Sequence, residues 1–122
     1  MKLHADPSDV QMVSAYGPGW ITINKQEHKG NLLVGSTGFL RPWNCANFES
    51  LTAQHFAELA QLNAELIIFG SGSKLRFVHP SWLLPLMQKR IGLETMDTHA
   101  ACRTYNVLAG EGRIVIAALM LE

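Results

Sequence analysis

The spacing of apolar positions changes partway along the chain, and this change divides the predicted fold into two parts. In the first third, residues 20–24 alternate with period two, with Ile21 and Ile23 on the same side, which indicates a half-buried strand. A polar connection over 25–29 leads to residues 31–34, an apolar segment that predicts the returning strand of a hairpin. The first third is therefore predicted to form antiparallel β-structure.

A turn and a proline bound this antiparallel part. Residues 16–19 are rich in glycine and proline, which is typical of a turn. Residues 41–43 include Pro42, whose backbone nitrogen cannot donate a hydrogen bond to a neighbouring strand. We therefore expect residues 41–43 to lie at the edge of a sheet.

The remainder of the chain alternates between helical spacing and short apolar runs. The apolar runs predict strands over 66–69, 93–96 and 114–121, and apolar residues at helical spacing predict helices over 52–63, 82–91 and 98–109. This alternation favours a largely parallel sheet with right-handed crossovers. The run over 114–121 is the best candidate for the centre of that sheet, because a strand covered on both faces is apolar throughout.

Capping residues and a proline set the predicted ends of the helices. Thr52 supplies an N-cap for the first helix, and either Asp97 or Thr98 supplies one for the third. Pro85 lies inside the second helix and should kink it or delay its start. Gly92 fits the C-terminal cap of that helix.

Length and pattern together predict one folded domain. A chain of 122 residues suits a single domain, because two domains of half that size would each bury little surface. Residues 1–9 carry Pro7 and two aspartates and are expected to form a flexible tail. Residues 10–122 are then a single α/β domain.

Few residues are charged, and the charges cancel. Charged residues make up 16% of the chain, against a typical value of about 25%, and ten basic residues balance ten acidic ones. A weakly charged surface resists self-association poorly, which favours a homodimer or a docking surface. The competing interpretation is a small domain whose surface consists of Ser, Thr, Asn and Gln. Because the basic residues are scattered, we expect no nucleic-acid partner.

The cysteines and the apolar runs bear on the compartment. Cys45 and Cys102 are far apart and form no CxxC motif, so we predict two reduced thiols, with a single disulfide as the alternative. The N-terminal residues lack the apolar core of a secretory signal, and the run over 114–121 is too short to span a bilayer. We therefore expect a soluble, cytoplasmic protein without a transmembrane segment.

A glycine-rich loop directly after the predicted strand 66–69 is the first candidate site. Ligands of open α/β sheets bind beyond the carboxyl ends of the strands, where Gly70, Ser71 and Gly72 are followed by Lys74. Glycines let backbone N–H groups approach an anion, and Lys74 adds positive charge. The loop matches neither the phosphate-binding P-loop nor the dinucleotide-binding glycine pattern, so a turn that needs small residues is the competing interpretation.

The helix start at Asp97 and Thr98 is the second candidate, because parallel strands bring it to the same edge of the sheet. Its simplest interpretation is an N-cap, with the Asp97 carboxylate favoured by the helix dipole. The alternative is a polar ligand site that adds His99, Cys102 and Arg103 from the first turns of the helix.

Nucleophilic and metal chemistry have no recognisable pattern in this chain. No serine lies in the Gly-x-Ser-x-Gly context of a nucleophile elbow. The histidines, at positions 4, 28, 55, 79 and 99, show none of the usual metal-binding spacings. Trp43 and Trp82 either anchor an interface or belong to a partly buried core. We therefore predict no metal, no cofactor and a protein that is not an enzyme.

Several short segments occur in an order that resembles one known family. They are residues 16–19, 30–33, Trp43, 67–72, 92–98 and 103–108. Together they resemble the small α/β domain family that includes mitochondrial complex I assembly factor 3 and the adipogenesis-associated domain protein. The resemblance extends from Val10 to Leu121, and the residues around Asp97 and Asn106 are its most specific part.

The resemblance implies a three-layer α/β fold, with a central mixed sheet flanked by helices and an additional N-terminal antiparallel β-hairpin layer. It supplies no catalytic residues. The characterised mitochondrial member works through protein contacts, so the resemblance implies a protein-binding or assembly factor with an unidentified protein partner. Because the chain has no Arg-rich leader, we expect a prokaryotic or stand-alone member. The alternative function is a small anionic ligand-binding protein or enzyme, with its site at Gly70–Lys74 and Asp97–Thr98.

Overall fold

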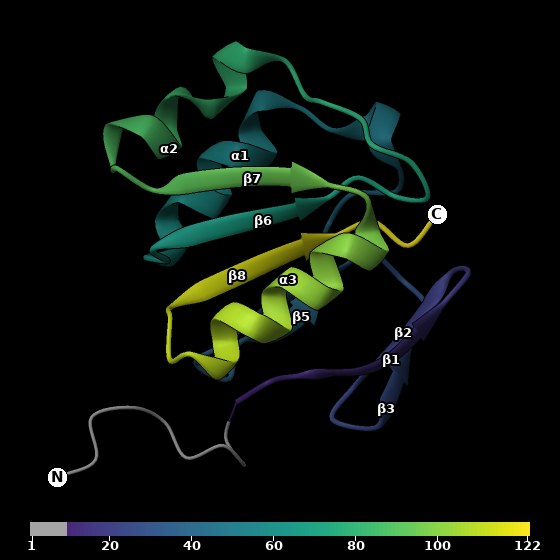
Figure 1. Cartoon of the computed structure of the whole chain (residues 1–122). Helices are drawn as coiled ribbons and strands as arrows, with labels where there is room; N and C mark the ends of the chain where they lie inside the picture. Colours follow the sequence, from purple (N-terminus) through teal and green to yellow (C-terminus); the bar gives the residue numbers. More distant parts are fainter. Residues whose placement is uncertain (1–9) are drawn as a thin grey trace, which may run out of the picture.

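The computed structural model describes residues 10–122 and contains two β-sheets and three α-helices (Figure 1). The predicted tail over 1–9 lies outside the described residues. The strands are β1 (Val13–Gly17), β2 (Trp20–Ile23), β3 (Gln26–His28), β4 (Leu32–Gly35), β5 (Leu40–Pro42), β6 (Leu66–Gly70), β7 (Gly92–Met96) and β8 (Val115–Leu119). The helices are α1 (Ala53–Leu59), α2 (Leu84–Gln88) and α3 (Thr98–Gly110), with short 3₁₀ turns at Phe48–Ser50, Ala60–Leu62 and Pro80–Leu83.

The larger sheet is mixed and has β8 at its centre. Its strand order is β5-β4-β8-β6-β7, with β8 parallel to β6 and antiparallel to β4. All five residues of β8 are buried, as predicted from the continuous apolar run. The parallel pairing of β6 with both β7 and β8 confirms the sheet predicted from strand–helix alternation. Strand β5 lies at one edge and contains Pro42, which confirms that prediction too.

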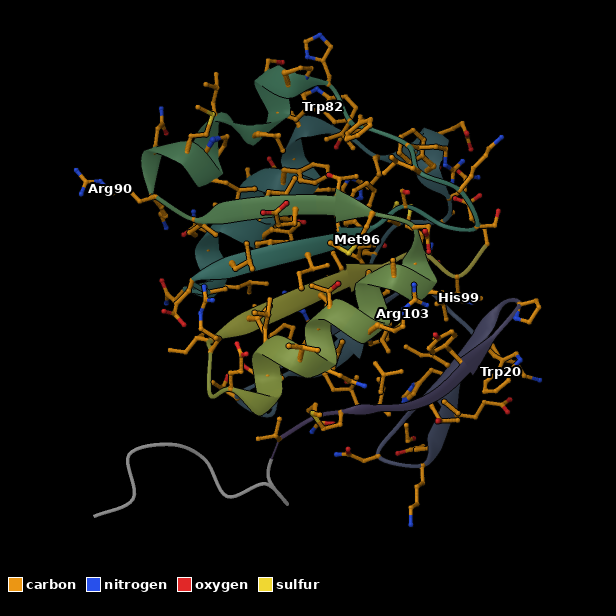
Figure 2. The ribbon with its side chains drawn as sticks, viewed as in Figure 1. Trp20, Trp82, Arg90, Met96, His99 and Arg103 are labelled. Carbon is orange, nitrogen blue, oxygen red and sulfur yellow. The ribbon has the colours of Figure 1, made fainter. Side chains whose placement is uncertain are left out.

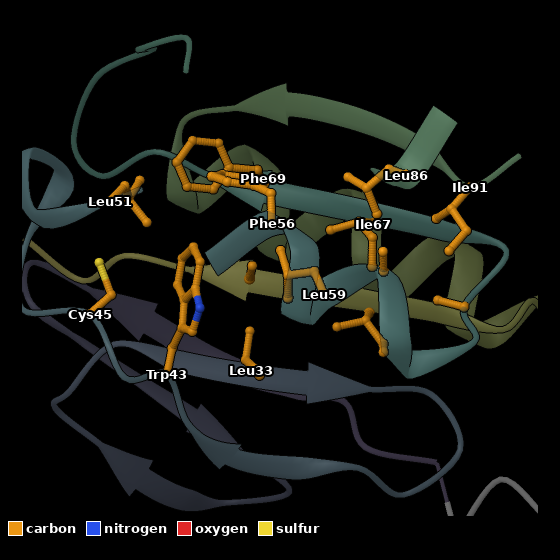
Figure 3. Packing of buried hydrophobic residues seen from close by; sticks show 14 of the residues in the cluster. Leu33, Trp43, Cys45, Leu51, Phe56, Leu59, Ile67, Phe69, Leu86 and Ile91 are labelled. Atoms are coloured by element: carbon orange, nitrogen blue, oxygen red, sulfur yellow. The ribbon is translucent and has the colours of Figure 1, made fainter. Parts of the chain in front are cut away.

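Side chains alternate across the larger sheet and build one core on each face. Ile67 and Phe69 of β6 point to the face covered by α1 and α2, where Phe56 and Trp43 pack against Phe69 (Figure 3). Ile68, between them, points to the face covered by α3, where Tyr105 is fully buried. The fold therefore has three layers, as the family resemblance implies.

The smaller sheet is antiparallel, has the order β1-β2-β3 and packs on the same side as α3 (Figure 1). Ile21 and Ile23 are both buried against this core, which confirms the predicted half-buried strand. The side chain of Asn106 holds β1 onto α3. Its Oδ1 accepts from the Val13 N–H at 2.9 Å, and its Nδ2 donates to the Val13 carbonyl at 2.7 Å.

The predicted hairpin between residues 20–24 and 31–34 is wrong. β2 pairs with β1 and β3, whereas residues 32–35 form β4 in the larger sheet. The reason is a two-residue turn at Asn24 and Lys25, whose φ angles of 48° and 73° reverse the chain directly after Ile23. The predicted polar connection over 25–29 therefore contains β3, and β1 is a strand that the pattern did not predict.

The second predicted helix is shorter than expected. Residues 80–83 form a 3₁₀ turn, and α2 begins only at Leu84, with Pro85 in its first turn. Pro85 thus delays the helix start, as predicted. Gly92 is not the C-terminal cap, because Arg90 takes the left-handed conformation at φ 58° and Gly92 already begins β7. Among residues 10–122, no helix is long and apolar enough to cross a membrane.

Candidate functional site

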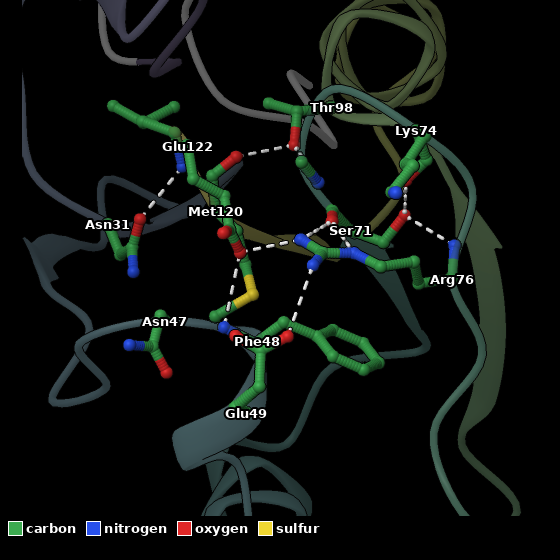
Figure 4. Close-up of polar contacts among 12 residues, drawn as sticks. Asn31, Asn47, Phe48, Glu49, Ser71, Lys74, Arg76, Thr98, Met120 and Glu122 are labelled. Atoms are coloured by element: carbon green, nitrogen blue, oxygen red, sulfur yellow. Dashed lines mark hydrogen bonds and ion pairs between the residues drawn. The ribbon is translucent and has the colours of Figure 1, made fainter.

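The carboxyl ends of β6, β7 and β8 meet at one edge of the larger sheet, where Thr98 joins three segments (Figure 4). The buried Thr98 hydroxyl accepts a hydrogen bond from the Gly72 N–H at 2.8 Å and donates one to the Met120 carbonyl at 2.6 Å. The Thr98 N–H also donates to the Gly72 carbonyl at 2.9 Å. Thr98 therefore ties the start of α3 to the loop after β6 and to the segment after β8.

The helix cap is Asp97, whose Oδ1 accepts a hydrogen bond from the Ala100 N–H at 2.9 Å. This contact confirms the N-cap interpretation and places the carboxylate at the positive end of α3. The sequence left the choice between Asp97 and Thr98 open. The structure assigns the cap to Asp97, because the Thr98 hydroxyl is engaged by Gly72 and Met120.

Both glycines of the loop are explained by close contacts. A Cβ atom on Gly70 would lie 3.0 Å from the Thr98 Oγ1 and 3.0 Å from the Leu119 Cδ2. Helix α3 can therefore approach β6 this closely only because residue 70 has no side chain. Gly72 has φ 105°, a conformation that side-chain-bearing residues rarely adopt, and a Cβ there would lie 2.8 Å from the Arg76 Nη2. The competing interpretation, a turn that needs small residues, therefore accounts for both positions.

Arg76 closes the loop and was not identified by the sequence. Its guanidinium donates to the Ser71 carbonyl at 2.6 Å from Nη2 and at 3.1 Å from Nε, and lies 4.4 Å over the Phe48 ring. It also pairs with Glu122 at 2.6 Å and with Glu49 at 3.6 Å. Because Glu49 and Glu122 are distant in sequence from Arg76, no local pattern could have predicted this cluster.

Ser71 is fully buried, and its hydrogen bonds hold the loop together. Its hydroxyl donates to the Lys74 carbonyl at 2.7 Å and accepts from the Arg76 N–H at 3.0 Å, while its own N–H donates to the Met96 carbonyl at 2.9 Å. Lys74 itself is exposed. The N–H groups of Ser71 and Gly72 are thus engaged by protein acceptors rather than directed at a ligand.

A cleft of about 260 Å³ lies where this edge meets the turn between β1 and β2. It is lined by Gly17, Pro18, Gly19, Gly72, Ser73, Asp97, Thr98, His99, Met120, Leu121 and Glu122. Three of the predicted site residues, Gly72, Asp97 and Thr98, therefore come together in it. The others, Gly70, Ser71, Lys74 and Arg103, do not line the cleft.

Arg103 and His99 contact the smaller sheet instead. The Arg103 Nη1 donates to the Tyr16 hydroxyl at 2.8 Å, a contact that raises the pKa of the guanidinium. The His99 ring lies 4.5 Å from the Tyr16 ring, and its Nε2 is 3.3 Å from the Gly17 carbonyl oxygen. Figure 2 shows both labelled side chains between α3 and the smaller sheet. They position the β1–β2 turn, which forms one wall of the cleft.

The charged side chains that line the cleft are both acidic. Its two acidic side chains, Asp97 and Glu122, repel an anion, and Arg76 partly neutralises Glu122. Cys102 lies on the buried side of α3, and burial raises the pKa of its thiol to about 12, so it is not a nucleophile at neutral pH. Among residues 10–122, no group of three or more His, Cys, Asp or Glu residues is arranged to hold a metal ion.

A second hollow of about 380 Å³ lies between β5 and α1. Trp43 forms its floor and is largely buried, and His55 hydrogen-bonds to the Asn44 carbonyl at 2.8 Å and the Thr52 N–H at 3.0 Å. Because the Thr52 N–H donates to Nδ1, the ring proton lies on Nε2, which donates a hydrogen bond to the Asn44 carbonyl. His55 thus holds the start of α1, whereas Trp43 belongs to the core.

Comparison with known proteins supports the fold and gives a direction for function. Residues 13–120 match the model of a family described as a protein of unknown function, DUF498/DUF598. A mouse protein, NADH dehydrogenase [ubiquinone] 1 alpha subcomplex assembly factor 3, is 35% identical over 91% of this chain and 66% of its own length. This chain thus spans just under two thirds of that relative.

Solved structures agree with the architecture. A crystal structure of a protein from Bordetella parapertussis has a TM-score of 0.88 and 31% identity, covering 96% of this chain and 100% of that one. A solution structure of a Bordetella pertussis protein, described as an Mth938-like domain, has a TM-score of 0.79 and 32% identity, covering 98% and 92%.

Proposed function

The chain belongs to the DUF498/DUF598 family, and from this membership we propose that it is a non-enzymatic protein-binding factor that assists assembly of a respiratory NADH dehydrogenase. The single observation that carries the proposal is the 35% identity to the mouse assembly factor over 91% of this chain. The partner is expected to be a protein of that enzyme.

The site geometry supports a binding role over a catalytic one. Thr98, Ser71 and Arg76 use their polar atoms to lock the loop after β6 against α3 and the C-terminal segment. We propose that the strand ends here act as a rigid support.

A cytoplasmic location is part of the proposal and is supported by the cysteines. Cys45 lies in the core on the α1 and α2 side of the larger sheet, whereas Cys102 lies in the core on the α3 side. The sheet between the two cores prevents a disulfide between them, so the predicted alternative of a single disulfide is wrong. Two buried, reduced thiols are typical of a reducing compartment.

Affinity purification tests the proposed partner. The tagged protein is isolated gently from the organism that encodes it, with membranes included, and the complexes are weighed by native mass spectrometry. We expect a stoichiometric complex with a subunit of the NADH dehydrogenase or with a second factor bound to that enzyme. Recovery of the chain only as a monomer or homodimer, with the enzyme's subunits elsewhere in the extract, would refute the proposal.

A second candidate function is a small-ligand site in the cleft, and the meeting of Gly72, Asp97 and Thr98 there favours it. An anionic ligand, as the sequence suggests, has weaker support, because Asp97 and Glu122 are acidic. Titration with inorganic phosphate, followed by the amide resonances of Gly72 and His99, tests this alternative. Chemical-shift changes that saturate with phosphate and become larger in the Asp97→Asn variant would support an anion site. Amide resonances that phosphate leaves unchanged would count against it.

A further inference from the structure

The crossover that connects β6 to β7 is basic, although the chain as a whole is neutral. Residues 71–91 contain four Lys or Arg residues and no Asp or Glu, so the rest of the chain holds six basic residues against ten acidic ones. One of the four, Arg76, is neutralised by Glu49 and Glu122. The other three, Lys74, Lys89 and Arg90, are exposed and form no ion pair with any residue in 10–122.

The same crossover also concentrates the exposed apolar side chains. Among residues 10–122, four of the six exposed large apolar residues lie within it: Leu75 at 53% exposure, Phe77 at 70%, Leu84 at 52% and Met87 at 65%. Single apolar residues scattered over a surface are ordinary, but four exposed ones within thirteen consecutive positions are an unusual concentration. We call these four residues, together with Lys74, Lys89 and Arg90, the crossover surface.

The apolar residues of the crossover fall into an inner and an outer set. Leu86 is buried in the core, and the Trp82 ring stacks on Phe56 at a centroid distance of 6.2 Å, so both anchor the crossover to α1. Leu84 and Met87, three positions apart on α2, lie on the outer side. A helix that is apolar on both sides normally has both sides covered, and here only the inner side is.

Helix α2 lies on the β7 side of the larger sheet, on the face opposite α3 and the smaller sheet, whereas Lys74 follows Ser73, which lines the cleft (Figure 1). Figure 2 shows Arg90 pointing away from the body of the protein on this side, with Trp82 farther along the same rim. The apolar residues Phe77, Leu84 and Met87 of the crossover surface line neither the cleft at Asp97 nor the hollow at Trp43. The position of this surface leaves it accessible to a large partner.

We propose that the crossover surface docks an acidic segment of a partner protein, whose apolar side chains cover Phe77, Leu84 and Met87 while its carboxylates face Lys74, Lys89 and Arg90. This inference rests on the proposed function and names the surface through which it acts. Charge complementarity selects the occupant, since a cationic surface without acidic residues favours an anionic partner. A second copy docked through the same surface would place like charges together, so a symmetric homodimer here is disfavoured.

A protein partner fits better than a membrane surface. Interfacial membrane binding typically uses a long amphipathic helix with a large apolar face, and α2 has only five residues. The basic residues of the crossover lie at its two ends, at positions 74, 76, 89 and 90, and do not form the continuous basic face of an amphipathic helix. An anionic lipid surface is accordingly an outcome that the test must distinguish.

Site-specific photo-crosslinking in the native organism tests the docking surface. A photoreactive phenylalanine analogue replaces Phe77 in one strain and Val107, which is 61% exposed on α3, in a control strain. Crosslinked peptides are sequenced. We expect a crosslink from position 77, absent from position 107, to a net-acidic segment of one protein.

Charge reversal provides the second arm. Lys74→Glu with Lys89→Glu should lower the crosslink yield roughly tenfold, because the rim charges steer association. Lys25→Glu with Lys29→Glu, an equal charge change on the smaller sheet, should leave the yield within about twofold. Equal losses from both pairs would overturn the docking surface and indicate only a net-charge effect.

The remaining outcomes separate this inference from the proposed function. A crosslink to an NADH dehydrogenase subunit from position 107 alone would overturn the docking surface but leave the proposed function standing. Self-crosslinking at 77, or sedimentation with phosphatidylglycerol vesicles without a protein crosslink, would overturn the acidic protein partner. No crosslink from either position, together with no co-purified subunit, would refute both.

Discussion

The hydroxyl of Thr98 lies 2.6 Å from the carbonyl oxygen of Met120, so the first residue of α3 is bound directly to the segment that follows β8. The same hydroxyl accepts from Gly72, and these two contacts bring together the three strand ends at the edge of the larger sheet. In this position Thr98 acts as a structural lock. Two of the candidate site residues, Gly72 and Thr98, thus have a structural role in the fold.

Replacement of Thr98 by valine tests this lock. The change keeps the side-chain shape but leaves the Gly72 N–H and the Met120 carbonyl without their partner in a buried site. We expect a loss of about 1–3 kcal/mol in the free energy of unfolding, measured by urea denaturation. Thr98→Ser keeps the hydroxyl and should retain most of this stability. A loss of stability in Thr98→Ser without a loss in Thr98→Val would show that the methyl group, and not the hydroxyl, is important.

The glycine at position 70 should be intolerant of even one methyl group. Gly70→Ala would place its Cβ 3.0 Å from the Thr98 Oγ1 and 3.1 Å from the Thr98 Cα, and overpacking of this kind costs about 1–3 kcal/mol. Gly110→Ala is the control, since no atom lies within 4 Å of a Cβ at the last residue of α3. The control should raise stability by about 0.5–1 kcal/mol. Thermal unfolding of the two variants gives the comparison, and a stable Gly70→Ala protein would contradict it.

The attachment of the smaller sheet should depend on Asn106. Its amide makes both hydrogen bonds to the backbone of Val13, so Asn106→Ala leaves a donor and an acceptor unpaired. We expect a loss of about 1–3 kcal/mol and faster hydrogen exchange at the Val13 amide than at amides of β8. Asn106→Asp restores only the acceptor and should recover part of the protection at Val13. Unchanged exchange at Val13 in Asn106→Ala would show that apolar packing alone holds β1.

The thiol of Cys102 should be inert in the folded protein. Burial raises its pKa to about 12, so in a Cys45→Ala protein the reaction of Cys102 with a thiol reagent should require global unfolding. Rapid labelling of the native protein at neutral pH would contradict this assignment.

The same shift predicts a direction for the pH dependence of stability. The unfolded chain releases the Cys102 proton near the ordinary thiol pKa of about 8.5, whereas the folded chain retains it up to about 12. Because the folded state then binds more protons, the free energy of unfolding falls as the pH rises through this window. Burial raises the pKa of Tyr105 as well, and that shift acts in the same direction. Cys102→Ala should reduce the slope of stability against pH above pH 9, and an unchanged slope would refute the contribution of this thiol.

The sequence predicted the parts of the fold that depend on local pattern. β8 is apolar throughout because both of its faces are covered, and the Asp97 cap follows from its place between a strand and a helix. The β2–β3 turn was missed because Lys25 occupies a left-handed position that usually selects glycine. The pairing of β4 with β8 was also missed, since it joins segments that are far apart in the sequence.

The candidate site could be predicted only in part, for a related reason. Gly72, Asp97 and Thr98 were placed at one edge by the parallel-sheet rule, and they do line one cleft. Arg76 and Glu122 were missed because their contact depends on tertiary packing. The crossover surface was not recognised either, because its exposure is a property of α2 and of the way Trp82 and Leu86 anchor it.

Complementation of a deletion strain tests whether the protein assists assembly of NADH dehydrogenase. The gene is removed from its organism, and assembled NADH dehydrogenase in the membranes is quantified by native gel electrophoresis and NADH oxidation. We expect the deletion to abolish the assembled enzyme, and the wild-type gene and Val107→Ser to restore it. Phe77→Ser with Met87→Ser should fail to restore it at equal protein levels. Normal amounts of assembled enzyme in the deletion strain would contradict the proposed function. Full rescue by the Phe77→Ser, Met87→Ser variant would contradict the docking surface alone.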